Sequence, residues 1–291
     1  MNLKSIAQKY WETHPHAASQ GQWTSNPIIG ETVYRRMSGG QSSKHWLSWL
    51  IESYFYGKHF QRVLCPGCGV GSHEIILAKS GIANVIDAFD FSEASILFAP
   101  KEACKAHVKI NFYIDDLNTF SIPEGIKYDL VICSGSLHHV KELERFLSLI
   151  QKILHPDGYF IVNEYVGDCY NIYNDKQIDI INKLLACFPP ELRSSSEQKF
   201  KNATIEQVMQ HDPSECVRSK LILPFLEYYF IPEFLQLFGG SILHILYPLL
   251  NNNSFSNLEN LEASTIVRLL LVIPLLPGMV GTPALFIAFF A

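Results

Sequence analysis

The segment Val63–Ile75 reads Val-Leu-Cys-Pro-Gly-Cys-Gly-Val-Gly-Ser-His-Glu-Ile, an apolar stretch that leads into glycines at alternate positions. Gly67, Gly69 and Gly71 permit backbone conformations that other residues rarely adopt, and they let a ligand lie directly against the chain. Because a helical pattern begins at once, its first backbone N–H groups face whatever polar group occupies the turn. The segment therefore predicts a strand, a tight turn and a helix that together bind a ligand.

The glycine spacing and the next acid indicate which cofactor binds there. Dinucleotide-binding folds carry G-x-G-x-x-G around a pyrophosphate, whereas this chain has G-x-G-x-G followed by Glu74, a carboxylate that suits an ammonium group better than a pyrophosphate. The next predicted strand, residues 84–89, ends in Asp90, about twenty residues further on, where a ribose-binding carboxylate is expected. The segment resembles motif I of the class I S-adenosylmethionine (SAM) dependent methyltransferases. NAD is the alternative cofactor.

This resemblance implies a set of cofactor contacts. In that family the glycine turn holds the methionine part of SAM, and the acid after the second strand holds the ribose hydroxyls. Asp115 is then expected at the adenine amino group, with Asp116 as the alternative if the register shifts by one residue. The cofactor-binding residues that the resemblance implies are Gly67, Cys68, Gly69, Gly71, Asp90, Phe91, Asp115, Asp116, Ser134 and Gly135.

One position departs from the family pattern. Motif I often has an acid two residues before its first glycine, and this chain has Cys65 there, so another residue, expected in the N-terminal region, must help to hold the methionine part. Cys65 and Cys68 also form a C-x-x-C pair, which is typical of redox or zinc sites. No second C-x-x-C and no spaced histidine pair follows, so neither a redox role nor a bound metal is expected.

The middle of the chain alternates strand and helix patterns. Residues 128–134 form a buried apolar run that resembles motif IV, Glu142–Leu154 has the apolar spacing of a crossover helix, and residues 159–166 follow as a fifth strand. Such alternation predicts an α/β, doubly wound, mostly parallel sheet whose ligands bind at the carboxyl ends of the strands. The family resemblance extends this to seven strands with an antiparallel last strand.

The predicted domain organisation has four parts. Residues 1–57 are expected to form a helical N-terminal arm that covers the cofactor site, and 58–166 the SAM-binding Rossmann-like core. Residues 167–225 are too long for a simple connection, so we expect a helical cap for the substrate between strands five and six. Residues 226–291 would complete the sheet.

The C-terminal part is interpreted as two strands. Residues 228–237 are expected to form the sixth strand, with Pro232 indicating an edge or a bulge, and Thr282–Ala291 the antiparallel seventh. A membrane helix over Leu269–Ala291 is the alternative, because that stretch carries no charge. Its prolines and glycines would break such a helix, so we expect no stable span, although loose membrane association through the C-terminus stays open.

Three ionisable residues are candidates for catalysis. His138 and His139 follow the fourth strand, and an imidazole with a near-neutral pKa can remove a proton from an alcohol as it attacks a methyl group. His139 is the preferred base, and Glu164, after the fifth strand, is the next candidate. All three would alternatively serve as capping or hydrogen-bonding residues.

The cap contains the sharpest candidates for substrate binding. Asp212-Pro-Ser-Glu215 is typical of a helix start, with Asp212 or Ser214 as the N-cap. Glu215 and Arg218 would then lie one helical turn apart, paired with each other or facing a substrate. The substrate residues are predicted to be Asp212, Glu215, Arg218 and Tyr165.

Those cap residues, with the segment 163–167, resemble a group of bacterial methyltransferases of glycan or secondary-metabolite pathways. The resemblance implies a small-molecule acceptor, first a hydroxyl of a sugar or secondary metabolite. N-methylation or a lipophilic acceptor is the alternative, and a SAM-binding protein without turnover is the alternative outside the enzymes.

Composition limits the remaining classes. A net charge of −5 and a pI near 6.1, without a basic stripe, argue against nucleic acid as a partner. The 7 cysteines show no disulfide-scaffold spacing, and residues 1–10 lack the apolar run of a signal peptide, so a cytoplasmic location with reduced thiols is expected. The oligomeric state stays open.

Overall fold

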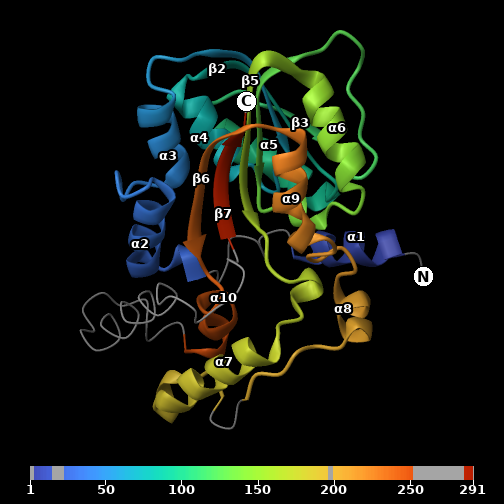
Figure 1. The fold of residues 1–291 in the computed structure, drawn as a ribbon. Coiled ribbons are helices and arrows are strands. Elements are labelled where there is room, and N and C mark those ends of the chain that lie inside the picture. Colours follow the sequence, from blue (N-terminus) through green and yellow to red (C-terminus); the bar gives the residue numbers. More distant parts are fainter. Residues whose placement is uncertain (1–2, 15–22, 196–198, 252–284, 291) are drawn as a thin grey trace.

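A single mixed sheet organises the part of the chain that the structure, a computed structural model, describes, namely residues 3–14, 23–195, 199–251 and 285–290. The sheet has the strand order β3-β2-β1-β4-β5-β7-β6 (Figure 1). The five strands from β1 to β5 pair in parallel, and β7 pairs antiparallel with both β5 and β6. The predicted α/β fold with a mostly parallel sheet is confirmed. The strands are β1 (Phe60–Pro66), β2 (Ala83–Asp90), β3 (Asn111–Ile114), β4 (Tyr128–Ser134), β5 (Leu154–Tyr165), β6 (Pro232–Gly239) and β7 (Leu285–Phe290).

Helices cover both faces of the sheet, as a doubly wound fold requires. In Figure 1, α3 and α4 lie on one face of the sheet and α6 and α9 on the other. The helices are α1 (Leu3–Thr13), α2 (Pro27–Met37), α3 (Trp46–Trp49), α4 (Ser72–Ser80), α5 (Glu93–Lys105), α6 (Leu143–Ile153), α7 (Asp175–Cys187), α8 (Ile205–His211), α9 (Ser219–Tyr229) and α10 (Leu243–Leu246).

Two apolar cores follow from the alternation of side chains along the buried strands. In β1, Val63 and Cys65 point into the core on the side of α3 and α4, whereas Leu64 points into the core beneath α6 and α9. Both cores are closed because the parallel strands are apolar on their two faces. The expected apolar face of α6 is confirmed: its residues Leu143, Phe146, Leu147 and Ile150 are fully buried.

Four further helices lie at the carboxyl edge of the parallel strands. In Figure 1, α1, α7, α8 and α10 lie beyond the lower end of the sheet, toward which β5 points. Helix α1 packs against α5 and α8, so the N-terminal segment reaches the edge where ligands bind in such sheets.

The expected bounds of the sixth strand are wrong by a few residues. Helix α9 continues to Tyr229, past the expected domain boundary at 225/226, and β6 begins only at Pro232. Pro232 does lie on an edge strand, and the pairing of β6 with β7 shifts register between Pro232 and Phe234, as a proline without an N–H donor favours.

The alternative of a membrane helix over Leu269–Ala291 falls largely outside the described residues. Within that stretch, Leu285–Phe290 forms strand β7. No helix in the described ranges is long and apolar enough to cross a membrane.

Candidate active site

The glycine turn joins β1 to α4 in the conformation that its sequence predicts. Gly67, Gly69 and Gly71 have φ angles of 70°, 53° and 83°, which only glycine adopts readily. A Cβ atom on Gly67 would come within 2.4 Å of the Cβ atom of Ser136, whereas one on Gly69 would meet no atom of the described residues within 4 Å. The turn is therefore tight at Gly67 and open at Gly69, where a ligand can approach the backbone.

Asp90 ends β2 directly beside this turn. Its Oδ2 atom accepts a hydrogen bond from the N–H of Gly69 at 2.9 Å, and its Oδ1 atom accepts one from the N–H of Ser92 at 2.9 Å. Burial raises the pKa of Asp90, and the backbone donors oppose that effect. Since each carboxylate oxygen has two lone pairs, ribose hydroxyl groups can still donate to it. Asp90 thus links the turn to the expected ribose position.

The two acids after β3 have different surroundings. The N–H of Asp115 donates to the carbonyl of Asp90 at 3.1 Å, which holds Asp115 beside the expected ribose position. Asp116 is committed to its own loop, because its Oδ1 atom accepts hydrogen bonds from the backbone and side-chain nitrogens of Asn118. The other residues implied for the cofactor, Cys68, Phe91, Ser134 and Gly135, follow β1, β2 and β4 at the same edge.

A small cavity lies against the glycine turn and contains a carboxylate that was not predicted among the cofactor residues. Glu74, in the first turn of α4, lines this cavity with Gly67 and Cys68. Its side chain is 4% exposed, and its Oε2 atom has no hydrogen-bond partner among the described residues. Burial raises the pKa of Glu74 to about 7, although a hydrogen bond with Cys65 lowers it. The residue that compensates for Cys65 was expected in the N-terminal region, whereas Glu74 lies in α4; Cys65 at the motif I acid position and an acid in the next helical turn are the signals that could have indicated it.

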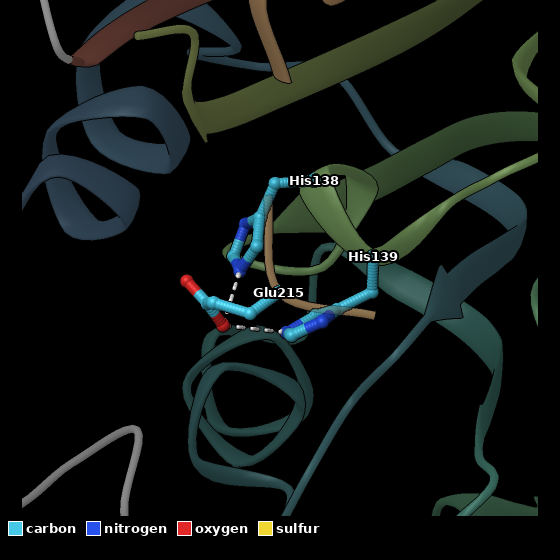
Figure 2. A group of neighbouring side chains, drawn as sticks. All are labelled: His138, His139 and Glu215. Atoms are coloured by element: carbon cyan, nitrogen blue, oxygen red, sulfur yellow. Dashed lines mark ion pairs between the residues drawn. The ribbon is translucent and has the colours of Figure 1, made fainter. Parts of the chain in front are cut away.

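The second half of the site is a cluster of two imidazoles and two carboxylates, here called the histidine–carboxylate cluster: His138, His139, Glu164 and Glu215. The histidines form a 3-10 turn after β4, and Glu164 is near the end of β5. Glu215 comes from the loop between α8 and α9, and its Oε2 atom lies 3.9 Å from the Nε2 atom of each histidine (Figure 2). The structure thus brings together the three predicted catalytic residues and one predicted substrate residue.

Both imidazoles are oriented through their Nδ1 atoms. The Nδ1 atom of His138 lies 2.5 Å from Oε1 of Glu164, and Oε2 of the same carboxylate accepts the N–H of Leu137 at 2.6 Å. The Nδ1 atom of His139 lies 3.0 Å from the hydroxyl of Ser214, which donates its own proton to Asp212 at 2.6 Å. That hydroxyl must therefore accept from His139. The Nε2 atom of each ring then faces the Glu215 carboxylate.

The two imidazoles differ in charge. Burial lowers the pKa of His138, but the carboxylate of Glu164, its hydrogen bond and the charges of Glu215 and Asp212 outweigh that effect and raise it to about 9. Burial and the neighbouring His138 cation lower the pKa of His139. In the absence of another cation, His138 is therefore an imidazolium at neutral pH, and His139 is neutral with a basic Nε2 atom.

The predicted helix start at Asp212 is wrong. Helix α8 ends at His211, and Asp212 follows it, where its carboxylate accepts from the N–H and hydroxyl of Ser214 at 2.9 and 2.6 Å. Cys216 has a φ of 50°, so the helical path is interrupted, and α9 begins only at Ser219. Asp212 therefore does not cap a helix. Its hydrogen bonds with Ser214 instead hold the loop that carries Glu215.

Arg218 does not pair with Glu215. Its guanidinium group donates two hydrogen bonds to Glu144 on α6, at 2.6 and 2.8 Å, and a third to the carbonyl of Lys141. The expected pair is wrong because these residues lie in a loop rather than one helical turn apart, and Arg218 contacts α6 instead of the histidine–carboxylate cluster.

Tyr165 ends β5 and lines a second small cavity. Its ring stacks on His244 with 5.3 Å between ring centroids, and its hydroxyl donates to the carbonyl of Asp168 at 3.3 Å. Tyr165 also packs against Cys216, which follows Glu215 in the sequence, so this cavity lies near the histidine–carboxylate cluster. The side chains that line it are mostly polar: Tyr165, Asp168, Tyr173, Gln177, Ser241 and His244.

Helix α1 contacts both halves of the site. The indole N–H of Trp11 donates to Oδ2 of Asp212 at 3.0 Å, and the ring meets that of His139 edge to face at 5.3 Å. The carboxylate of Glu12 accepts the N–H groups of Glu93 and Ala94 at the start of α5, next to the expected ribose position. The N-terminal segment therefore bridges from the cofactor edge to the histidine–carboxylate cluster.

A glycine turn, a ribose-type acid and an ionisable cluster at one edge of a mostly parallel sheet define the class of Rossmann-like SAM-dependent methyltransferases. The comparisons with known proteins give the family. The model of the methyltransferase-domain family matches residues 59–228, and the chain belongs to that family, whose members use SAM.

Two curated relatives illustrate the similarity. The uncharacterized methyltransferase C1347.09 of Schizosaccharomyces pombe is 30% identical over 166 residues, which cover 52% of this chain and 55% of the relative. A ubiquinone biosynthesis O-methyltransferase of Rickettsia akari is 29% identical over 124 residues, covering 40% of this chain and 47% of the relative. The chain thus spans about half the length of the curated relatives that it matches.

Among solved structures, that of the [4+2]-cyclase SpnF covers 98% of this chain and 95% of its own, with a TM-score of 0.52 and 13% sequence identity. At that identity the likeness concerns the fold alone. A fold of this kind hosts more than one reaction, so the reaction has to be argued from the site.

Proposed function

We propose that this chain transfers the methyl group of SAM to a hydroxyl group of a small molecule, first a sugar or secondary metabolite. The observation that carries the proposal is the closeness of the two halves of the site. Ser136 packs on Gly67 of the glycine turn and directly precedes the histidine turn, so a methyl group held at the glycine turn is next to the imidazoles.

The chemistry needs little beyond alignment and removal of one proton. Holding the acceptor oxygen, the methyl carbon and the sulfonium sulfur in line supplies much of the acceleration. As the oxygen–carbon bond forms and the carbon–sulfur bond breaks, the neutral His139 takes the hydroxyl proton at Nε2, and S-adenosylhomocysteine (SAH) leaves. The His138 imidazolium, fixed by Glu164, keeps the acceptor side of the site polar.

Within the cofactor half, we assign Gly67, Gly69 and Gly71 to the methionine part, Asp90 to the ribose and Asp115 to the adenine. Glu74 is assigned to the α-ammonium group of the methionine part. Its buried, unpartnered Oε2 atom in the cavity beside the glycine turn supports this role, because a buried carboxylate requires a donor. Glu74 would thus supply the acid that Cys65 replaces in motif I.

The arm and the cap are proposed to form the walls of the acceptor site. Trp11 from α1 and Asp212 from the cap are hydrogen-bonded to each other beside His139, and Glu215 comes from the cap as well. The polar cavity around Tyr165 and His244 favours a hydroxylated acceptor. Strand β7 pairs antiparallel with β5 and would thereby hold in place the strand that carries Glu164 and Tyr165.

A lipophilic phenol is the second candidate acceptor. The names of two curated relatives refer to ubiquinone biosynthesis and to 2-methyl-6-phytyl-1,4-hydroquinone, the latter for a Synechocystis methyltransferase 22% identical over 181 residues. A panel of sugars, polyols, phenols, short-chain quinols and amines, incubated with SAM labelled in its methyl group, tests both candidates. Label in a product together with an equal amount of SAH supports transfer, and label in amines alone contradicts the hydroxyl assignment.

The Asp90→Ala variant is expected to bind SAH about 10–100-fold more weakly than the wild type, because it loses charge-assisted hydrogen bonds to the ribose. Isothermal titration calorimetry measures this. The Asp90→Asn variant is the matched control for shape, and it should lose less than the alanine variant does. Failure of the wild type to bind SAH, or equal affinity of Asp90→Ala, would refute the cofactor assignment.

Asp212 and Arg218 are expected to behave differently in the cap. Asp212→Asn should raise the acceptor KM and lower the melting temperature, because the side chain accepts from Trp11 and Ser214 and positions His139. Arg218→Ala should leave KM unchanged and cost about 1 kcal/mol of stability or less, since its ion pair with Glu144 is partly exposed. KM and melting curves for both variants test this contrast, and an unchanged KM for Asp212→Asn rejects the role of Asp212 at the site.

A further inference from the structure

Three acceptor atoms converge at the centre of the histidine–carboxylate cluster. They are Nε2 of His138, Nε2 of His139 and Oε2 of Glu215, and the possible ligand atoms of these three residues lie within 4.8 Å of one another. Figure 2 shows both rings directed at the carboxylate. As an imidazolium, His138 directs its own Nε2–H toward Glu215; once that proton is lost, the facing lone pairs of the three atoms need a cation between them.

The outer contacts fix the rings for coordination. Glu164 holds Nδ1 of His138, and Ser214, itself donating to Asp212, holds Nδ1 of His139. Histidines that bind metals in proteins are commonly oriented in this way, with Nδ1–H on a carboxylate or another oxygen and Nε2 left for the ion. The far oxygen of Glu215 is likewise held, since Oε1 accepts from Asn171 at 3.0 Å.

We propose that His138, His139 and Glu215 form a binding site for a divalent cation, Zn²⁺, with a fourth position open to the acceptor. Two imidazole nitrogens and one glutamate oxygen are a donor set of catalytic zinc sites. Two of the three donor pairs are 3.9 Å apart and all three donors lie within 4.8 Å of one another, so small side-chain movements would bring them to the distance of about 2.0–2.1 Å that Zn²⁺ requires. The side chains retain 13%, 16% and 32% exposure, which leaves a face for the fourth ligand.

No metal was expected, because neither a second C-x-x-C nor a spaced histidine pair follows the first C-x-x-C in the sequence. Adjacent histidines on a helix or a strand point in different directions, but the 3-10 turn at Leu137–His139 brings their rings to 4.1 Å between centroids. The third ligand comes from a loop 76 residues beyond His139 in the sequence (215 minus 139), so no local spacing pattern contains the site.

The cation would change how the acceptor loses its proton, and this part of the inference rests on the proposed function. The acceptor hydroxyl takes the fourth position, where the ion lowers its pKa, and its proton leaves to solvent water. The oxygen then bonds to the methyl carbon, and the electron pair of the broken carbon–sulfur bond stays on the sulfur of SAH. With the ion bound, His139 is a ligand rather than the base. The cation site itself does not depend on methyl transfer.

The test uses the full chain, stripped with a chelator, reloaded with Zn²⁺ alone and washed. Elemental analysis is expected to find about one Zn²⁺ per chain in the wild type, and Co²⁺ in its place should give the visible absorption of a tetrahedral site. His139→Ala and Glu215→Gln should lose the ion, and Glu164→Gln should bind it about 10–100-fold more weakly. His155→Ala and Glu124→Gln, which change exposed side chains away from the cluster, are matched controls that should keep it.

SAH binding, measured for every variant, reports whether each one is folded. No stoichiometric Zn²⁺ in the folded wild type, or equal Zn²⁺ in folded Glu215→Gln and His139→Ala, overturns the cation site. Full methyl transfer by the stripped enzyme overturns the catalytic part. Stoichiometric Zn²⁺ in the wild type that is lost in the ligand variants supports the site, whether or not an acceptor is methylated. Absence of methyl transfer to every acceptor would count against the proposed function and not against the cation site.

Discussion

Replacing His139 with alanine is expected to lower kcat by about 10²–10⁴-fold while SAH binds as tightly as to the wild type. The Nε2 atom of His139 is the basic nitrogen of the cluster, and its ring is held by Ser214 and packed against Trp11. The cofactor contacts that we assign to the glycine turn, Asp90 and Asp115 do not involve His139, so the loss should fall on the chemical step. Single-turnover rates with saturating SAM, alongside calorimetric titration with SAH, measure the two quantities separately.

Glu164→Gln is expected to lower kcat as well, because glutamine no longer stabilises the His138 cation although it retains the size of the side chain. His155→Ala, which changes a histidine exposed to solvent, is the matched control and should leave both quantities unchanged. The zinc content of His139→Ala distinguishes loss of a base from loss of a metal ligand. Wild-type turnover in both His139→Ala and Glu164→Gln would remove the cluster from the reaction.

The cofactor half of the site could be predicted from local sequence because its physical causes are local. A glycine turn needs positive φ angles at fixed positions, and the acid at the end of the next strand is placed by parallel pairing of β1 with β2. The core was predictable for the same reason, since the apolar spacing along α6 follows from the helical period.

The acceptor half could be predicted only as a list of residues. His138 follows β4 and Glu164 lies near the end of the neighbouring strand β5, so the sheet brings them together. Glu215 lies in a loop whose conformation depends on contacts with residues distant in the sequence. The pattern around Asp212 predicted a helix start, and this is wrong. The carboxylate of Asp212 accepts hydrogen bonds from Trp11, 201 residues away, and from Ser214 rather than from the N–H groups of a helix N-terminus. Tertiary partners overrode a local capping signal there.

Replacing Glu74 with glutamine is expected to weaken SAM and SAH binding about 10–100-fold at pH 8, because a buried carboxylate is lost opposite the α-ammonium group. The pH dependence should change with it. In the free wild type the pKa of Glu74 is raised to about 7 by burial, and the ligand cation lowers it, so binding below pH 7 must release a proton. Wild-type affinity should therefore fall by up to about tenfold per pH unit below 7, whereas the glutamine variant should lack this slope.

Stability supplies the control for this assignment, because its expected change has the opposite sign. The pKa of Glu74 is near its ordinary value of 4.5 in the unfolded chain and is raised to about 7 in the folded one, so the folded protein binds the proton more tightly. Its contribution to the free energy of unfolding is then fully present below pH 4.5 and is lost as the pH rises toward 7. At pH 8 the ligand-free Glu74→Gln variant should melt at the same temperature as the wild type or higher, while binding SAH less well. A lower melting temperature with unchanged affinity would instead make Glu74 a structural partner of Cys65, and the methionine part of SAM would need another carboxylate.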